Sequence, residues 1–207
     1  MPAANAYVLS MRKRAFDLIV AGMVSLVAAP LVALCALAVR LESAGSPIYR
    51  QWRVGRDEHR FEIVKLRTMV SGAEQLGAGL AVDAGDARIT RVGKVLRRTS
   101  LDELPNLVNI LRGEMSLVGP RPTLEHQVAT YDERQRIRQQ VRPGVTGWAQ
   151  INGRASLPWP ERIELDLWYL EHATLRLDVQ ILLRSVRIAI TGEDLYRGER
   201  GGWRPSA

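Results

Sequence analysis

The sequence predicts a mostly α fold with a small β element, an α+β organisation whose N-terminus is held in a membrane. Three observations predict it: one long uncharged apolar segment, several segments with apolar residues at helical spacing, and one short run that alternates as a strand does. With 207 residues the chain is long enough to bury a core without disulfides or structural metals. We expect a membrane segment over residues 1–40, a compact cytoplasmic domain over 41–191 and a flexible tail over 192–207.

The N-terminal apolar segment is the first element. Residues 18–39 carry no charge and would measure about 33 Å as an ideal helix, enough to cross a hydrocarbon layer of roughly 30 Å. Pro30 stands near the middle and leaves halves of ~15 to 18 Å, each too short to span alone. A proline inside a helix removes one backbone hydrogen bond and bends the helix. Ala29 and Pro30 are therefore the expected hinge of the membrane segment.

Basic residues flank this segment on both sides. Residues 12–14 (Arg-Lys-Arg) precede it, and Arg40 and Arg50 follow it. Basic flanks are retained on the cytoplasmic side of a membrane. A re-entrant helix that bends at Pro30 and returns to the same face satisfies that rule at both ends, whereas a straight span violates it at one. We favour the re-entrant helix over a straight span, and either over a cleaved signal peptide, whose apolar run is usually shorter.

The rest of the chain is a soluble, arginine-rich domain. Residues 61–66 alternate as a short strand, and the glycine- and alanine-rich residues 71–87 predict a helix start and a flexible loop. Helical patterns or composition cover 89–98, 104–111, 124–141, 160–171 and 178–190, with proline-rich loops at 119–122 and 142–147. The helices over 89–98 and 178–190 are amphipathic and basic, so we expect them at a membrane surface; a merely solvated helix face is the alternative.

The charge balance indicates a polyanionic partner. Twenty-nine lysines and arginines against 22 acidic residues give a net charge of +7 and a pI near 10.2. Nucleic acid, anionic lipid headgroups and phosphorylated substrates would each suit such a surface. Aromatic residues amount to 6% and no nucleic-acid recognition motif is evident, so we expect no nucleic-acid partner. The single cysteine, Cys35, excludes a disulfide framework and a cysteine-rich zinc module.

Two adjacent acids, Asp102 and Glu103, stand where a helix is expected to begin. Ser100 and Glu103 match a capping box, and Asp102 would also serve as an N-cap, so periodicity alone favours a structural role. The same position would also suit a catalytic role, because the N-terminus of a helix keeps an Asp side chain ionised and attracts phosphate groups. An ionised carboxylate beside a phosphate site is what covalent phosphoryl transfer needs.

Such chemistry requires cations near the two acids. Divalent metal and fixed cations relieve the repulsion between an anionic nucleophile and an anionic substrate. Arg97, Arg98, Arg112 and Arg121 are near in sequence. Arg121 stands between two prolines, which restrict its backbone. A guanidinium held in this way is well suited to donate two parallel hydrogen bonds to a phosphate.

Seven ordered segments resemble one known family. They are KRAFD (13–17), QWRVG (51–55), KLRTM (65–69), DARIT (86–90), SLDELPN (100–106), GEMSLVGPRP (113–122) and PGVTGWAQINGR (143–154). In this order they resemble the bacterial sugar transferases, the monotopic polyprenyl-phosphate phosphoglycosyltransferases, in their minimal catalytic form. The resemblance implies transfer of a phosphosugar from a UDP-sugar to undecaprenyl phosphate with release of UMP, catalysed by the 41–191 domain.

The resemblance also implies roles for individual residues. Asp102 aligns with the nucleophile that forms a covalent phosphosugar intermediate, Glu103 with its partner acid, and Arg121 with a phosphate-binding arginine. Mg²⁺ is the implied cofactor, with Asp102 as its ligand. The family's re-entrant helix breaks at Ser-Pro, where this chain has Ala29 and Pro30. The implied location is the bacterial inner membrane, with the domain in the cytoplasm and membrane lipids as partners.

Further cations and amides are candidates for substrate contact. They are Lys65, Arg67, Arg98, Arg112, Gln150 and Arg154. Solvated lysines and arginines and a packed turn are the structural alternatives for them. For the whole protein the alternative is a membrane-anchored binding or assembly protein without catalysis, in which Asp102 and Glu103 only cap a helix.

Overall fold

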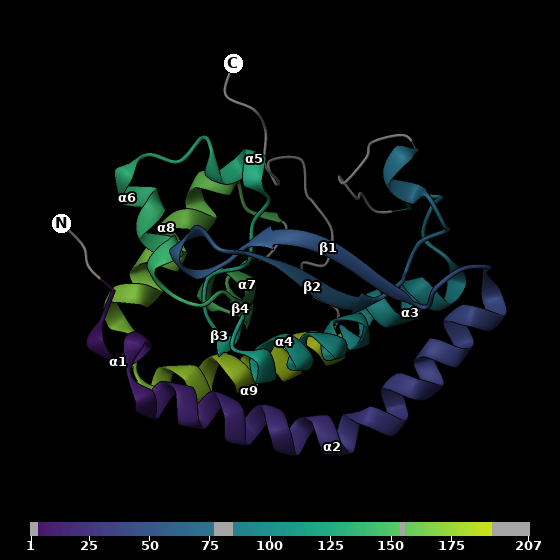
Figure 1. Ribbon diagram of the computed structural model, residues 1–207, viewed down its shortest axis with the longest axis horizontal. Coiled ribbons are helices and arrows are strands. Elements are labelled where there is room, and N and C mark those ends of the chain that lie inside the picture. Colours follow the sequence, from purple (N-terminus) through teal and green to yellow (C-terminus); the bar gives the residue numbers. More distant parts are fainter. Residues whose placement is uncertain (1–3, 77–84, 154–155, 192–207) are drawn as a thin grey trace.

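Helix α2 (Met11–Glu42) is the longest element and contains the whole predicted apolar segment. It is seen in a computed structural model that describes residues 4–76, 85–153 and 156–191. The helix continues through Pro30 and is curved, so that both ends turn toward the rest of the molecule (Figure 1). The proline removes one hydrogen bond from the helix, which permits a bend. The predicted bend is therefore present as curvature of one continuous helix.

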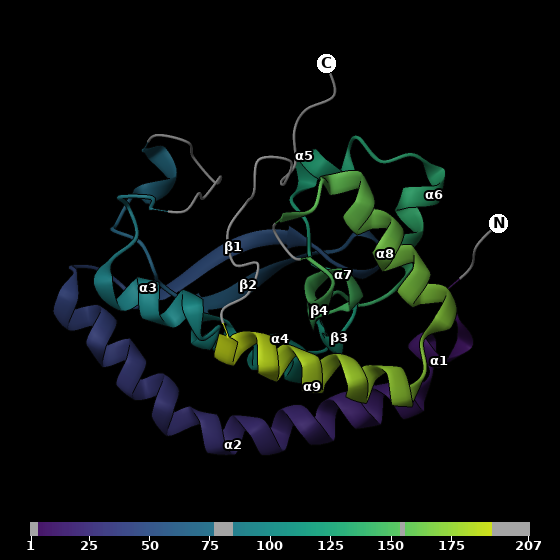
Figure 2. The ribbon, with the colours of Figure 1, turned by 180° about the vertical axis from the view of Figure 1, so that it is seen from behind.

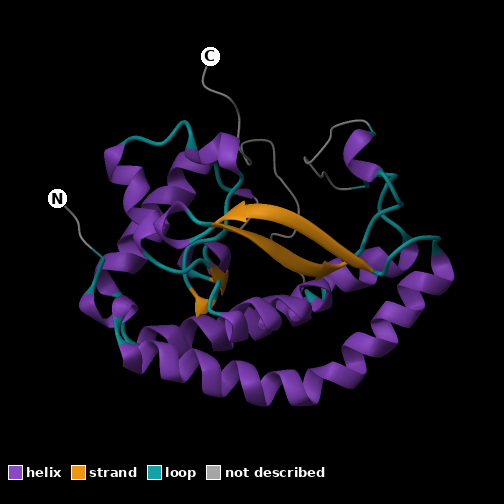
Figure 3. Cartoon of the chain, in the orientation of Figure 1, coloured by secondary structure: helices purple, strands orange, loops and turns teal. Residues whose placement is uncertain are grey.

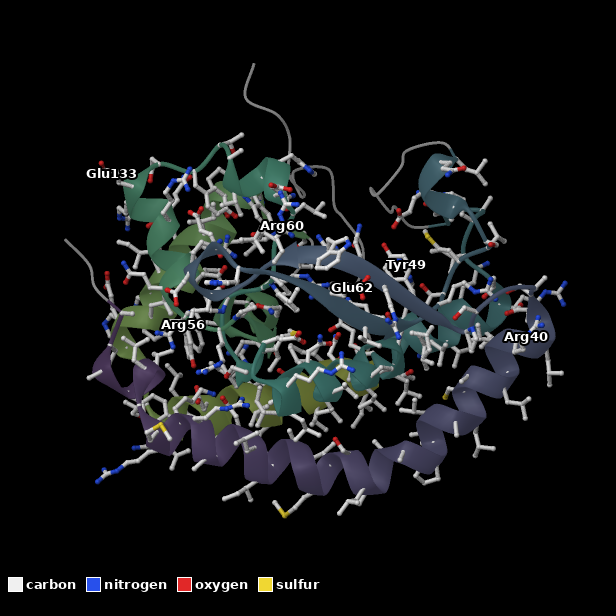
Figure 4. The ribbon with its side chains drawn as sticks, in the orientation of Figure 1. Arg40, Tyr49, Arg56, Arg60, Glu62 and Glu133 are labelled. Carbon is white, nitrogen blue, oxygen red and sulfur yellow. The ribbon has the colours of Figure 1, made fainter. Side chains whose placement is uncertain are left out.

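The outer surface of α2 is apolar and uncovered. Only 6% of its most apolar stretch is buried inside the chain, and Leu26 and Val27 are 81% and 80% exposed. The core helix of a soluble protein would be mostly buried instead. At the C-terminal end Arg40 is exposed and points away from the domain (Figure 4). In length and composition α2 is a helix that could cross a membrane, which agrees with the predicted membrane segment.

A β-hairpin crosses the middle of the molecule, and the C-terminal half of α2 packs against one of its strands (Figure 3). Strands β1 (Ile48–Val54) and β2 (Arg60–Leu66) pair antiparallel, and Tyr49 and Glu62 mark its outer part in Figure 4. The sequence predicted only β2. The residues of β1 mix three polar with four apolar or aromatic side chains and show no clear alternation, so that pairing with β2 rather than local pattern determines this strand.

A second, parallel pair of strands joins the two proline-rich loops. Strand β3 (Ser116–Val118) pairs with β4 (Gly144–Thr146). A Cβ at Gly144 would lie 2.1 Å from the backbone nitrogen of Gly119, so only glycine permits this approach. The pairing places the loop that carries Arg121 beside the 142–147 loop, which the sequence did not predict.

The remaining helices are mostly short and pack around these strands. The expected helix over 124–141 is broken, because Asp132 accepts a hydrogen bond from the backbone of Gln135 and starts a new helix there. Helix α9 runs beside α2 in both ribbon views (Figures 1 and 2). The bounds are α1 Ala6–Leu9, α3 Arg91–Arg98, α4 Leu107–Arg112, α5 Glu125–Val128, α6 Glu133–Arg136, α7 Trp148–Ile151, α8 Trp159–His172 and α9 Leu175–Thr191, with 3-10 helices η1 Arg56–Glu58, η2 Ala73–Gln75, η3 Leu101–Asn106 and η4 Ile137–Gln140.

The main core lies between the hairpin, β3 and helices α4, α8 and α9. Ile110, Met115, Val118, Leu167 and Ile181 are its most completely buried side chains. A smaller cluster of buried apolar side chains joins the C-terminal half of α2 to β2 and α3. Both clusters hold the membrane helix against the domain by apolar contact.

A buried ion network also ties α2 to the C-terminal helices. Nζ of Lys13 lies 2.7 Å from Oδ1 of Asp17 and 2.9 Å from Oδ2 of Asp178, and none of these side chains is more than 3% exposed. The hydroxyls of Tyr7 and Tyr169 donate to the Asp178 carboxylate at 2.9 and 2.7 Å. Lys13 is thus not a free basic flank of the membrane segment, as its place in the sequence indicated, but the cation of a buried cluster.

The network continues into β3. The Ser116 hydroxyl donates to Oδ2 of Asp17 at 2.7 Å, and the backbone N–H of Leu117 donates to Oδ1 at 3.3 Å. Strand β3 leads directly into the loop that carries Arg121. The beginning of the membrane helix and this loop are therefore held in a fixed relation.

The C-terminal end of α2 is attached to α3 and β2. Both oxygens of the Glu42 carboxylate accept backbone N–H groups at the start of α3, from Arg91 at 2.8 Å and Val92 at 2.9 Å. The Arg67 guanidinium donates to the carbonyls of Ser43 and Ala44 just beyond α2. These contacts satisfy orphan groups at two helix ends and fix the point where α2 returns to the domain.

Candidate active site

Asp102 and Glu103 lie on η3, the single-turn segment between α3 and α4. Ser100, just before it, has a left-handed φ of 56°, and no side chain caps the start of η3. The segment packs against β2 instead, and the Glu103 carboxylate reaches Lys65 of that strand. The capping interpretation of this acid pair is therefore wrong, because no side chain caps η3 and the Glu103 carboxylate binds cations instead.

The two carboxylates line a cavity of about 200 Å³. Its other lining residues come from segments far apart in the sequence, and six of them are charged. They are Lys65, Arg97, Ser100, Arg121, Arg138, Ala149, Gln150, Trp159, Arg162 and Asp166. Charges grouped in a recess with low-dielectric walls act more strongly on a ligand than the same charges on an open surface.

Glu103 holds two cations on one oxygen. Its Oε1 accepts from Nζ of Lys65 at 2.6 Å and from Nη2 of Arg121 at 3.1 Å. Burial opposes ionisation here, but the charges of Lys65 and Arg121 prevail and hold the pKa of the Glu103 carboxyl well below its usual range. Glu103 is therefore an anion that positions two cations, and it carries no proton to donate at neutral pH.

Asp102 is the member of the pair whose carboxylate makes no ion pair in the part of the chain that the structure describes. Among the described residues none donates a hydrogen bond to its carboxylate or lies within ion-pair distance of it. Burial, followed by the charge of Glu103, raises the Asp102 pKa to about 6, although Lys65, Arg97 and Arg121 oppose the rise. At neutral pH the carboxylate is mostly ionised and makes no ion pair. These are the properties of a nucleophile.

The cations around Asp102 are held by contacts of their own. Nε of Arg97 donates to Oγ1 of Thr68 at 2.8 Å. The backbone oxygen of Arg121 accepts from Nη2 of Arg138 at 3.2 Å, and the preceding carbonyl of Pro120 accepts from the backbone of Gly144 at 2.8 Å. The guanidinium groups are therefore placed before any ligand arrives, which limits the ordering cost of binding.

The far part of the cavity is formed by η4, α7 and α8. Nη2 of Arg138 lies 2.6 Å from Oδ2 of Asp166, and both side chains are buried. Burial raises the Asp166 pKa to about 6, against the opposing charge of Arg138. Gln150 and Trp159 complete this wall.

The comparison with known proteins identifies the family. The family described as bacterial sugar transferase matches residues 8–192, nearly the whole chain. The chain belongs to the bacterial sugar transferase family. The family resemblance drawn from the sequence is confirmed, and the protein is an enzyme of the transferase class.

Relatives of this sugar transferase cover most of its length. It is 40% identical over 186 residues to the sugar transferase EpsL of Bacillus subtilis, spanning 89% of this chain and 90% of that one. It is 42% identical over 195 residues to a UDP-glucose:undecaprenyl-phosphate glucose-1-phosphate transferase of Caulobacter vibrioides, spanning 90% and 72%. It is 40% identical over 186 residues to a UDP-N-acetylgalactosamine-undecaprenyl-phosphate N-acetylgalactosaminephosphotransferase of Aeromonas hydrophila, spanning 87% and 44%.

Five of the residues expected in the sugar transferase site meet in the cavity. Lys65, Asp102, Glu103, Arg121 and Gln150 all line it, although they lie up to 85 positions apart between Lys65 and Gln150. The structure thus brings together the acid pair, two of the expected cations and the expected amide.

Three other expected residues do not line this cavity. The Arg67 guanidinium is occupied by the carbonyls beyond α2, which corrects the expectation that it contacts substrate phosphate. Arg98 and Arg112 are exposed near the ends of α3 and α4, beside exposed apolar side chains, so a headgroup contact suits them better. Arg154 and the tail over 192–207 lie outside the described residues.

Arg138, Arg162 and Asp166 line the cavity but were not expected there. No spacing relates them to Asp102, and charged residues in helices usually face solvent. Asp166 did carry a signal, because it falls among Ile163, Leu167 and Leu170 on the buried face of α8. A carboxylate on an apolar helical stripe needs a buried partner, and Arg138 is that partner.

The carboxylates of this cavity suit Mg²⁺ only when a bound substrate supplies further oxygen ligands. Within the described ranges no three or more His, Cys, Asp or Glu side chains gather to hold a metal. Glu103 is engaged by Lys65 and Arg121, whereas the Asp102 carboxylate makes no ion pair. Mg²⁺ is commonly held by one or two carboxylates plus phosphate oxygens and water. Asp102 with a bound diphosphate fits that pattern.

Proposed function

We propose that this enzyme transfers a sugar 1-phosphate from a UDP-sugar to undecaprenyl phosphate, the first membrane step in the synthesis of a bacterial glycoconjugate. The names of the Caulobacter and Aeromonas relatives supply the donor and acceptor classes. The observation that carries the proposal is the unpaired carboxylate of Asp102, ionised at neutral pH in a cavity with Lys65, Arg97 and Arg121. A nucleophile amid fixed cations suits attack on a diphosphate.

In the first step an oxygen of Asp102 attacks the sugar-bearing phosphorus of the donor. The bond between that phosphorus and the bridging oxygen breaks, and UMP leaves with the bridging oxygen. A phosphosugar remains esterified to Asp102. Lys65 and Arg121, which Glu103 holds 2.6 and 3.1 Å from its Oε1, stabilise the negative charge that develops on the transferred group and on the departing phosphate.

Asp102 and the donor diphosphate would hold Mg²⁺ between them. When bound, the ion would neutralise phosphate charge and reduce the repulsion between two anions. The amount of positive charge needed is large, because both the attacking carboxylate and the donor are anionic.

In the second step an oxygen of the lipid phosphate attacks the same phosphorus. The ester bond to Asp102 breaks, the carboxylate is regenerated, and the sugar is left on a lipid diphosphate. The acceptor phosphate lies at headgroup depth, so the cavity must be held there. A re-entrant α2, with both ends cytoplasmic, and the exposed apolar side chains of α3, α4 and α9 would achieve this at the inner membrane.

The direct test is to incubate the protein with donor alone. The purified chain in nanodiscs, given UDP-glucose or UDP-N-acetylgalactosamine and Mg²⁺, should release up to one UMP per protein and gain the mass of one phosphosugar. Addition of undecaprenyl phosphate should discharge the adduct into the lipid fraction. Asp102→Asn should form no adduct and lose transfer by at least ~10³-fold.

Two further arms make this test decisive. Chelation of divalent metal with EDTA should abolish adduct formation, and added Mg²⁺ should restore it. Glu62→Gln, on the outer part of the hairpin, is the control and should retain wild-type turnover. Full transfer by Asp102→Asn, or membrane binding with no UMP release from any UDP-sugar tried, would instead favour a non-catalytic anchored protein.

A further inference from the structure

The lining of the cavity contains two chemically different groups of residues, called its two ends below, and Arg121 interacts with acids of both. The charge of Glu103 above all, followed by those of Asp102 and Asp166, raises the pKa of Arg121, so both ends act on this one guanidinium. One end carries Asp102, Lys65 and Arg97, and the other is the wall formed by Gln150, Trp159, Arg138, Arg162 and Asp166. In the proposed function the first end acts on phosphate, which leaves the second end without a use.

The second end contains buried polar atoms that lack hydrogen-bond partners. They are Nε2 and Oε1 of Gln150, Nε1 of Trp159 and Nε of Arg138. Arg138 is only 3% exposed. Each such atom costs about 1–3 kcal/mol in a folded protein, and several at one place indicate a group that binds there and satisfies them.

We propose that this wall is the subsite for the uracil ring of the nucleotide donor. The inference rests on the proposed function, because it assigns the uridine half of the UDP-sugar to a place in the same cavity. Three of the unpartnered atoms are N–H donors and one is an acceptor. The edge of uracil presents two carbonyl acceptors on either side of one N–H donor, which is the complementary set.

Trp159 contributes its edge rather than its face. The guanidinium carbons of Arg138 and Arg162 lie 5.6 and 5.7 Å from the centre of its ring, within cation–π range. The cations occupy the ring face on which a base or a sugar would stack. The indole N–H is therefore the group of Trp159 that recognises the base. Because an indole N–H can only donate a hydrogen bond, it pairs with a ring carbonyl of a base and not with an exocyclic amino group.

The direction of the reaction agrees with this assignment. In phosphoryl transfer the attacking and leaving oxygens lie roughly in line, so UMP departs on the side of the phosphorus opposite Asp102. Gln150 and Trp159 line the same cavity as Asp102 but come from α7 and α8 rather than from η3, so the cavity offers the leaving nucleotide a wall of its own. Helix α8 begins at Trp159 on the side of the molecule away from α2 and runs toward it (Figure 2).

The test measures binding of UMP alone, with no turnover required. Trp159→Phe keeps an aromatic ring beside both guanidinium groups but removes the N–H together with part of the indole, and Gln150→Leu keeps the approximate size of the amide. Calorimetry on each variant in nanodiscs should show UMP bound about tenfold more weakly than by wild type, with Mg²⁺ present throughout. The exposed Trp168→Phe and Gln140→Leu are matched controls and should bind UMP as wild type does.

A second arm separates the uracil ring from other parts of the donor. Wild type should bind UMP at least tenfold more tightly than CMP, and Trp159→Phe should reduce that preference. Glucose 1-phosphate binding should be the same in wild type and both variants. Unchanged UMP affinity in both variants, or weakened glucose 1-phosphate binding with UMP unaffected, overturns the assignment. Because adduct formation from a UDP-sugar is measured separately, the assignment can fail while the transferase proposal stands.

Discussion

At the scale of the residue, the decisive feature is that two neighbouring carboxylates have opposite environments. Glu103 shares one oxygen between Lys65 and Arg121, whereas Asp102 is buried beside them with no partner among the described residues. The pKa of Glu103 is lowered and that of Asp102 is raised to about 6. Pairs of acids whose environments separate their pKa values are typical of sites with divided roles.

The raised pKa of Asp102 predicts a gain in stability when its charge is removed. Above pH 6 the ionised carboxylate is less stable in the folded chain than in the unfolded one, so Asp102→Asn should stabilise the fold by ~2 kcal/mol at pH 7 without divalent cation. Below a pH of about 4 both states are protonated and the gain should vanish. Thermal unfolding of both proteins at several pH values in EDTA checks this. A variant less stable than wild type at pH 7 would contradict it.

At the scale of the element, Glu42 shows how the membrane helix determines the position of α3. Its carboxylate accepts two backbone N–H groups of that helix, and those hydrogen bonds outweigh burial and lower the Glu42 pKa. Helix α3 carries Arg97 into the cavity and leads directly into η3. The end of α2 is therefore coupled to η3 through this cap as well as through the apolar cluster that joins α2 to α3.

Glu42→Ala should destabilise the protein by about 1 kcal/mol, the usual effect of losing a helix cap. Since the folded pKa of Glu42 is lowered, its contribution is present above the ordinary carboxyl pKa and is lost as the pH falls through the folded value. Unfolding temperatures at pH 7 and at acid pH provide the measurement. The half-buried Glu62, which caps no helix and whose side chain makes only a surface ion pair with Arg50 among the described residues, provides the control: Glu62→Ala should change stability by less than ~0.5 kcal/mol at either pH.

Pro30 permits the curvature of α2, and curvature determines topology in a membrane. In a chain with Cys35→Ser, single cysteines at Met11→Cys and Ser46→Cys should both resist an impermeant maleimide added to intact cells and react after permeabilisation. Pro30→Ala restores the missing hydrogen bond and should straighten the helix, so one of the two positions becomes reactive from outside. Labelling of one position only, with Pro30 present, would establish a straight span.

At the scale of the whole molecule, the buried network of Lys13, Asp17 and Asp178 joins the membrane helix to the domain. It connects α1, α2, β3, α8 and α9, elements that are distant in sequence. Removal of one member of a buried ion cluster leaves the other charges unpaired, which is far more costly than loss of an exposed pair.

Lys13→Met should therefore destabilise the protein by about 3–5 kcal/mol, because Asp17 and Asp178 would be left with no cation between them. Arg12→Met, one position away and exposed, should change stability by no more than ~0.5 kcal/mol. Chemical denaturation in detergent micelles compares the two. Equal effects from the two substitutions would show that the network contributes little.

The sequence by itself determined the features that depend on local pattern and composition. An uncharged segment long enough for the bilayer gave α2, a proline in its middle gave the curve, and helical spacing gave α3, α4, α8 and α9. Asp102, Glu103, Lys65, Arg121 and Gln150 were found from local motifs and from the family they resemble. Each of these features depends on a short segment of sequence, in which hydrophobic periodicity and turn-forming residues can be recognised directly.

Only the tertiary structure decided which charges are paired. It placed Arg67 at the end of α2 instead of in the cavity, made Lys13 a buried cation, and brought Arg138 and Asp166 to the cavity that Asp102 lines. It also created β1, β3 and β4, whose strands depend on partners far along the chain. The physical reason is the same throughout: the environment of a charge, and hence its pKa and its role, depends on neighbours that packing supplies, and no local spacing encodes them.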